Sequence, residues 1–385
     1  MKGTKITFFS RLGRKERLFF TICWLLGALA LGLVWWAKGH PDWVEQYYSL
    51  WFYPRWAGVL AALTTPVPFS LAEWIVILAA VGALAFLIRS IWIIAHKKGE
   101  RSYLLLLMLF RAGGAAALVL FFFTLSGGLN YYRYPFSFYS GLEVKESPVS
   151  QLTALCQELA DTANQLRSGL QEDQRGVYTY APASHWEMSE QAMESYQALI
   201  NANPQWEQLL TLAGRVRPKP VFFSEAMSYM QIVGVFFPYT IEANVNIHTS
   251  DIDIPHAMCH ELCHIAGFMR EDEANFIAYL ACRESASKDF QYSGTMTALI
   301  HATNALYGVD TESYRQVMAA LSDQVMLDLQ ADSEYYQAHK SSFGEFSTKV
   351  NDVYLKANSQ SDGVASYGRM VDLLLADYRT RHGIE

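Results

Sequence analysis

Residues 255–275 read PHAMCHELCHIAGFMREDEAN, and this stretch decides the fold around it. It contains His260-Glu261-Leu262-Cys263-His264, in which the two histidines stand at positions i and i+4. In an α-helix this spacing puts both imidazoles on one face, one turn apart, which suits the binding of a single zinc ion. Glu261 then lies beside the open coordination position, where it can take a proton from water. The sequence therefore predicts a zinc-dependent hydrolytic site on a helix.

The same stretch predicts two helices joined by a tight turn. Pro255 is typical of a first helical turn, and Gly267, three residues after His264, suits a left-handed helix end. We expect residues 268–270 to reverse the chain. A second helix is expected to begin at Glu271 and to run back past the first.

A catalytic zinc ion needs a third protein ligand, and the start of the second helix offers three carboxylates. Helical phase places Glu271 on a face of small side chains that allows close approach to the first helix, whereas Glu273 shares a face with larger residues. We therefore expect Glu271 to be the third ligand, with Glu273 as the alternative. Asn275, one turn after Glu271, is expected to hydrogen-bond a ligand histidine. An acidic first turn can also serve only to stabilise a helix through its dipole.

Two other residue types near the motif have simpler interpretations. His256 lies one turn before the histidine pair, and we expect a polar residue near the helix start rather than a ligand. Cys263 points about 100° away from His264 around the helix, which favours packing. The five cysteines of the chain do not make a disulfide framework.

The first third of the chain is strongly apolar. Of the 385 residues 51% are hydrophobic, and the mean hydropathy is +0.08, which argues against a purely soluble protein. Residues 18–37, 74–95 and 103–129 form long apolar runs, and about 20 such residues suffice to cross a bilayer. We predict three transmembrane helices that form a membrane anchor.

The basic residues orient this anchor. Six precede the first run and three lie between the second and third, whereas only Lys38 and Arg55 lie between the first and second. The positive-inside rule then places residues 1–17 in the cytoplasm, residues 18–129 in the plasma membrane and residues 130–385 outside the cytoplasm. The net charge of −7 and the lack of a basic patch give no reason to expect nucleic acid as a partner.

The outer domain is expected to be mainly helical. Helices are predicted after Ser147-Pro148 and from Ser189, and helical patterns continue to Tyr378 with a break near residues 359–363. Residues 221–223, 232–237 and 240–248 are rich in β-branched and aromatic side chains, which predicts a small sheet. The predicted fold is thus an α-helical anchor and a mainly α, α+β zincin-like outer domain.

Two family resemblances extend this interpretation. Glu271-Asp272-Glu273-Ala274-Asn275 resembles the E-x-x-A-D/N second motif of gluzincin metallopeptidases, which include the membrane-bound Ste24-like proteases and antirepressor-type peptidases. This resemblance implies that Glu271 is a ligand and that Asn275 supports the ligands. The spacing between the two motifs is shorter than in most gluzincins, which keeps Glu273 as an alternative. The whole chain also resembles an uncharacterised bacterial membrane-protein family, domain of unknown function 3810, in the three apolar runs, residues 130–133, residues 238–246, the zinc motif and residues 271–280.

The expected function is that of a membrane-anchored zinc metallopeptidase with a peptide or protein substrate. One Zn²⁺ ion is held by His260, His264 and Glu271, and Glu261 is the general base. Strand 240–248 is expected to offer its edge to an extended peptide. The residues considered as oxyanion partners are Tyr239, His248, His301 and Tyr307.

The alternative is a catalytically silent zinc-binding sensor or interaction protein of the cell envelope. The intact Glu261 argues against it, because a sensor needs no base. Cleavage inside the membrane is disfavoured, since the motif lies in a polar stretch far from the apolar runs.

Overall fold

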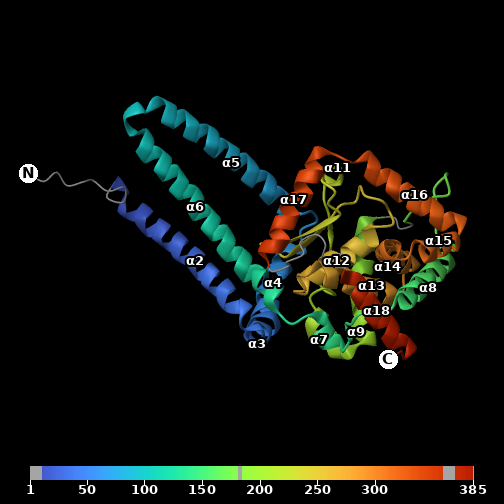
Figure 1. Ribbon diagram of the computed structural model, residues 1–385. Helices are drawn as coiled ribbons and strands as arrows, with labels where there is room; N and C mark the ends of the chain where they lie inside the picture. Colours follow the sequence, from blue (N-terminus) through green and yellow to red (C-terminus); the bar gives the residue numbers. More distant parts are fainter. Residues whose placement is uncertain (1–10, 181–183, 359–368, 385) are drawn as a thin grey trace, which may run out of the picture.

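The computed structural model describes residues 11–180, 184–358 and 369–384. Helices α2 (Arg14–Lys38), α5 (Leu71–His96) and α6 (Arg101–Ser126) project from the globular part in Figure 1. All three are long and apolar enough to cross a membrane, which confirms that the three apolar runs form long helices and indicates membrane association. The third ends at Ser126, earlier than predicted, because Gly128–Tyr132 (η3) forms a 3-10 turn.

Helices α2 and α6 pack closely because small residues line their contact. A Cβ atom at Gly27 would overlap Ala117, and one at Gly113 would overlap the Trp24 ring. Small residues at such positions let helix backbones approach within a membrane. Helix α5 is much more exposed, and its only buried residues are Ala72 and Ser90.

The segment between the first two spans belongs to the globular part. It forms α3 (Pro41–Trp43), a π-helix η1 (Val44–Phe52) and α4 (Tyr53–Thr64), and its buried side chains share one hydrophobic core with the motif helix. The Tyr53 hydroxyl donates a hydrogen bond to the Ile265 carbonyl at 3.0 Å. The core therefore includes residues that precede residue 130.

The motif helix α12 (Ile254–Ile265) packs against α13 (Glu271–Glu284), which in turn packs against α14 (Lys288–Val309). Helix α9 (His185–Ala202) begins four residues before the predicted Ser189, because Ser184 accepts a hydrogen bond from the Glu187 amide and caps it. The predicted break at residues 359–363 lies outside the described residues. The remaining helices are η2 (Lys98–Glu100), α7 (Phe136–Ser140), α8 (Val149–Arg167), η4 (Pro204–Trp206), α10 (Glu207–Leu210), α11 (Ser224–Tyr229), α15 (Thr311–Ala319), α16 (Asp323–Ala338), α17 (Ser342–Ala357) and α18 (Met370–His382).

The small sheet consists of β1 (Lys219–Pro220), β2 (Gly234–Phe237) and β3 (Glu242–Val245) in the order β1-β3-β2. Strand β1 runs parallel to β3, and β2 runs antiparallel to it. The prediction that the strand before the motif helix offers its edge was wrong, because β3 is central and has a neighbour on each side. The strand at the edge beside α12 is β2.

Hydrogen bonds attach the central strand β3 to the start of the long apolar helix α5. Buried Glu242 of β3 accepts hydrogen bonds from the Leu71 and Ala72 amides, at 3.2 and 2.8 Å, and thereby caps α5. The Lys219 ammonium pairs with the same carboxylate. Ser70 donates to the Asn244 side chain at 2.6 Å. The sheet is thus fixed to the first turn of the second span.

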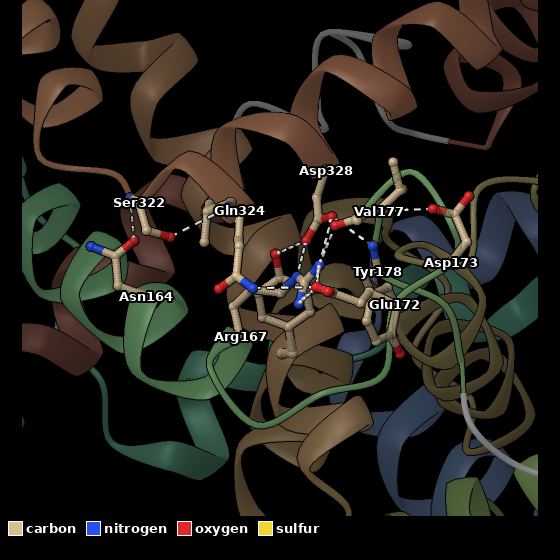
Figure 2. A network of polar contacts seen from close by, with 12 residues as sticks. Asn164, Arg167, Glu172, Asp173, Val177, Tyr178, Ser322, Gln324 and Asp328 are labelled. Atoms are coloured by element: carbon tan, nitrogen blue, oxygen red, sulfur yellow. Dashed lines mark hydrogen bonds and ion pairs between the residues drawn. The ribbon is translucent and has the colours of Figure 1, made fainter.

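In the region of the globular part that lies far from the spans, a buried ion pair holds several helices together (Figure 2). Arg167 of α8 donates to Asp328 of α16 at 2.6 Å, and both side chains are almost fully buried. Asp328 also accepts from the Tyr292 hydroxyl at 2.6 Å and from the Tyr178 amide at 2.7 Å. These bonds connect α8, α14 and α16, and they compensate for burying both charges.

Candidate metal centre

The two motif histidines and Glu271 converge on one point. His260 Nε2 lies 3.2 Å from Glu271 Oε2, and His264 Nε2 lies 3.8 Å from Glu271 Oε1. One potential ligand atom from each residue lies within 4.8 Å of the others. Two ligand atoms at 2.0–2.1 Å from a tetrahedral zinc ion lie about 3.3 Å apart, and the 3.2 and 3.8 Å separations between Glu271 and the histidines are close to this requirement.

Hydrogen bonds to the Nδ1 atoms set the direction of both rings. His260 Nδ1 lies 2.8 Å from Asn275 Oδ1, and His264 Nδ1 lies 2.8 Å from the Phe268 carbonyl oxygen. Because both partners are acceptors, each Nδ1 donates a proton, and each Nε2 is directed toward Glu271, where it can ligate a metal once it is unprotonated. The contact to Asn275 is the one that helical phase predicts.

The turn between the two helices places Glu271 opposite the histidines. Gly267 has φ 91°, the left-handed conformation expected of it, and a Cβ atom there would contact Asn130 and Arg133. Buried Arg133 pairs with Glu45 at 2.8 Å, donates to the Ala266 carbonyl and accepts a bond from Arg270 on its own carbonyl. Arg133, which lies shortly after the third apolar helix, therefore stabilises the turn between α12 and α13.

Glu273 points to a different neighbourhood. Its Oε1 atom accepts hydrogen bonds from the Phe136 amide and from Arg270, each at 2.9 Å. Burial raises the pKa of this carboxyl, against the lowering effect of Arg270. Of the two glutamates considered as the third ligand, Glu271 is the one beside the histidines. Its role as a metal ligand remains a prediction.

Glu261 is buried in the wall of the same site. Its Oε2 atom has no hydrogen-bond partner among the described residues. Burial, with a further contribution from the Glu271 charge, raises the pKa of the Glu261 carboxyl to about 8. Gly234 of β2 lies against it so closely that a Cβ atom there would overlap the carboxyl group. A carboxyl group with a pKa near neutrality and a free oxygen, next to three potential metal ligands, is chemically suited to exchange a proton.

Burial and charge also set the protonation of the histidines. Burial lowers the pKa of His264 to about 4, which keeps its imidazole neutral, the form that ligates metals. Burial disfavours the charged form of His260 as well, but the hydrogen bond and charge of Glu271 outweigh this and raise its pKa. Burial, with repulsion from His260, lowers the pKa of His256 to about 3.

The site opens into a cleft of about 880 Å³. Its walls come from β2, the motif helix, the last turn of α6 and the inner face of α17. His256 lines the cleft and its Nε2 atom lies 3.2 Å from the Asn275 carbonyl, outside the group formed by His260, His264 and Glu271.

Two of the four residues considered as oxyanion partners line this cleft. They are Tyr239, whose hydroxyl donates to the Val119 carbonyl of α6, and His301. His248 instead contacts Tyr335, and Tyr307 is exposed; neither lines the cleft. All five cysteines are buried and free, including Cys263.

Sequence reasoning missed Gly234 and the Arg133–Glu45 pair. A single glycine within a strand pattern often marks a close backbone approach, so Gly234 had a detectable signal. Arg133 and Glu45 are 88 positions apart, and no local pattern connects them.

Comparison with known proteins gave one match. The profile of the family described as Protein of unknown function (DUF3810) matches residues 48–375, which span the second and third membrane helices and the candidate site. No curated protein and no solved structure gave a significant match.

Proposed function

We propose that the chain, which belongs to the family described as Protein of unknown function (DUF3810), is a membrane-anchored zinc metallopeptidase of the gluzincin type. The observation that carries the proposal is the convergence of His260, His264 and Glu271 beside the unpartnered carboxylate oxygen of Glu261. A structural site would need a closed set of ligands and no adjacent base, whereas this set leaves a coordination position open.

Each residue has a defined task in peptide hydrolysis. His260, His264 and Glu271 would hold the ion, which when bound lowers the pKa of a water molecule and polarises the substrate carbonyl. Glu261 accepts a proton from the attacking water and delivers it to the leaving amine nitrogen. Asn275 and the Phe268 carbonyl keep the two imidazoles in the tautomer that ligates the ion.

The edge strand β2 provides a place for an extended peptide. Residues 232–236 line the cleft, and Gly234 contacts Glu261. An extended segment that pairs with such an edge gains backbone hydrogen bonds without any requirement on its sequence. A bound peptide on β2 would thereby lie alongside the base and the metal ligands.

The proposed location of the site is outside the cytoplasm. The globular part lies at the C-terminal ends of α2 and α6 and at the N-terminal end of α5 (Figure 1), so it occupies the side opposite to the start of α2. The positive-inside rule assigns the basic N-terminus to the cytoplasm.

Metal content and turnover of the full-length protein in detergent test the proposal. We expect wild type and Glu261→Gln to retain zinc, while turnover of casein or a peptide library falls about 10²–10⁴-fold in the variant. Glu312→Gln, an exposed carboxylate on α15, is the matched control and should keep full turnover. Zinc without turnover in the wild type would favour the sensor, and a zinc-free wild type would exclude both functions.

A further inference from the structure

Helix α17 carries an apolar stripe that no part of the described chain covers. Phe343, Phe346, Val350 and Val353 are 72, 67, 49 and 67% exposed. At 100° per residue their positions fall within a sector of about 80° on one side of the helix. Leu78 and Val81 of the membrane helix α5, at 67 and 60%, are exposed to the same degree.

The other sides of α17 have different surroundings. Gly344 and Leu355 are buried, and Ser347, Asn351 and Tyr354 line the cleft that contains the proposed metal ligands, as does Val350 at the edge of the stripe. Lys349 and Lys356 follow the stripe on its remaining flank, where both are exposed and Lys356 pairs with Asp352 at 2.7 Å. The apolar side of the helix is thus bordered by the cleft wall along one edge and by charged residues along the other.

Both ends of α17 are held near the ends of membrane spans. At its start, Ser341 donates to the Tyr229 carbonyl of α11. Helix α11 directly follows Phe222 and Phe223, whose amides donate to Glu73 in the first turn of α5. At its other end, the Tyr354 ring contacts Phe123 in the last turn of α6, at 6.1 Å between ring centroids.

Because one end of α17 contacts α6 and the other contacts α11, which follows the residues bonded to the start of α5, the helix lies across the level at which those spans leave the bilayer. Figure 1 shows it on the side of the globular part nearest to the spans. Phe222, beside the first turn of α5, is 80% exposed at the same level.

We propose that α17 is a membrane-surface helix whose apolar stripe is inserted among lipid headgroups and upper acyl chains. Phenylalanine and valine on the inserted side with lysines at its border are typical of helices that lie in the membrane interface. The lysine stems can lie along the apolar region while their ammonium groups reach the phosphates. The lipid surface is the occupant because it is continuous with the surface that surrounds α5 and α6.

This placement sets the substrate class, an inference that rests on the proposed function. The cleft is walled by α17 and by Phe123 and Gly127 at the end of α6, so its mouth lies at the bilayer surface. We infer that the substrate is a polypeptide anchored in the same membrane, cleaved close to its anchor.

The test uses the full-length protein in vesicles of phosphatidylcholine and phosphatidylglycerol. An environment-sensitive fluorophore is attached to Phe346→Cys, with the neighbouring Glu345→Cys and the distant Glu312→Cys as matched controls. The five native cysteines are buried, and labelling of the parent protein measures their background. We expect brominated lipids to quench the label at position 346 several-fold more strongly than the labels at 345 and 312.

Equal quenching at positions 346 and 312 would overturn the proposal. A blue-shifted label at 346 that brominated lipid does not quench would also overturn it, and would point to a second copy of the chain on the stripe. Neither readout depends on zinc or turnover, so failure here is distinct from failure of the peptidase function. If turnover is found, a lipid-anchored peptide should be cleaved faster than the same peptide without its anchor. Equal rates would exclude the inferred substrate class.

Discussion

The imidazole of His260 is held by Asn275 across the interface between two helices, with 2.8 Å between Nδ1 and Oδ1. One residue belongs to α12 and the other to α13, so the contact also fixes the distance between the two helices that carry the proposed metal ligands. Partners of this kind hold a histidine in its ligating tautomer and strengthen it as a ligand.

Removing this acceptor should weaken metal binding. We expect Asn275→Leu to lower zinc affinity about 10–100-fold, the usual effect of losing such a partner. Competition with a chromophoric chelator measures the change. Asn275→Asp keeps an acceptor oxygen and should bind zinc nearly as well as wild type. Equal affinity in Asn275→Leu and wild type would show that the contact does not support a ligand.

The two candidate glutamates should respond in opposite ways. Glu271→Ala should lose zinc with little change in fold, because its carboxylate faces the histidines. Glu273→Ala should keep zinc but lose about 1–3 kcal/mol of stability, because the Phe136 amide and Arg270 lose their acceptor. Zinc content and thermal unfolding of both variants separate the two roles. Loss of zinc in Glu273→Ala alone would make Glu273 the ligand.

Gly234 should be essential for catalysis and not for metal binding. A methyl group there would displace the Glu261 carboxyl, and a displacement of about 1 Å can reduce turnover about 10²-fold. We expect Gly234→Ala to show this loss with unchanged zinc content. Gly308→Ala, where a Cβ atom meets nothing within 4 Å, is the matched control. Full activity in Gly234→Ala would mean that β2 can move away from the base.

Stability should depend on pH through Asp253 and Asp332, two partly buried acids near the cleft. Burial, with repulsion from Asp332, raises the pKa of Asp253 to about 7. A raised carboxyl pKa in the folded state means that its contribution to stability is complete below about pH 4 and is lost as the pH rises through about 7.

Asp332→Asn removes the repulsion and should therefore stabilise the protein more at pH 8 than at pH 5. A gain of about 1 kcal/mol corresponds to roughly 2–4 °C in Tm for a domain of 150–250 residues. Thermal unfolding at both pH values provides the measurement, with Glu334→Gln on the same helix as an exposed control. An equal increase in Tm at both pH values would contradict the repulsion between Asp253 and Asp332.

The parts of the site that could be predicted from sequence are those set by local geometry. The histidine spacing, the left-handed Gly267 and the contact of Asn275 all follow from helical phase within 21 residues. The membrane helices follow from the length of apolar runs. The place of β2 at the sheet edge could not be predicted, because β1 and β2 both pair with β3 and strand order depends on contacts distant in sequence.

The residues that stabilise the turn between α12 and α13 could not be predicted either. Arg133 and Glu45 meet only because the π-helix η1 folds back beside η3, and neither residue type nor spacing indicates this. The exposed stripe of α17 is visible as a pattern, but its orientation toward the spans depends on anchors at Tyr229 and Phe123.

The hydrogen bonds from the first turn of α5 to Glu242 fix the height of the site above the bilayer. An enzyme on a flexible tether samples a range of heights above the bilayer and cuts wherever its target happens to meet it. Here hydrogen bonds fix the central strand to the start of α5, so in the proposed peptidase the scissile bond must come to one fixed height above the bilayer. Such an enzyme would select its targets by the distance of their cleavage point from the membrane.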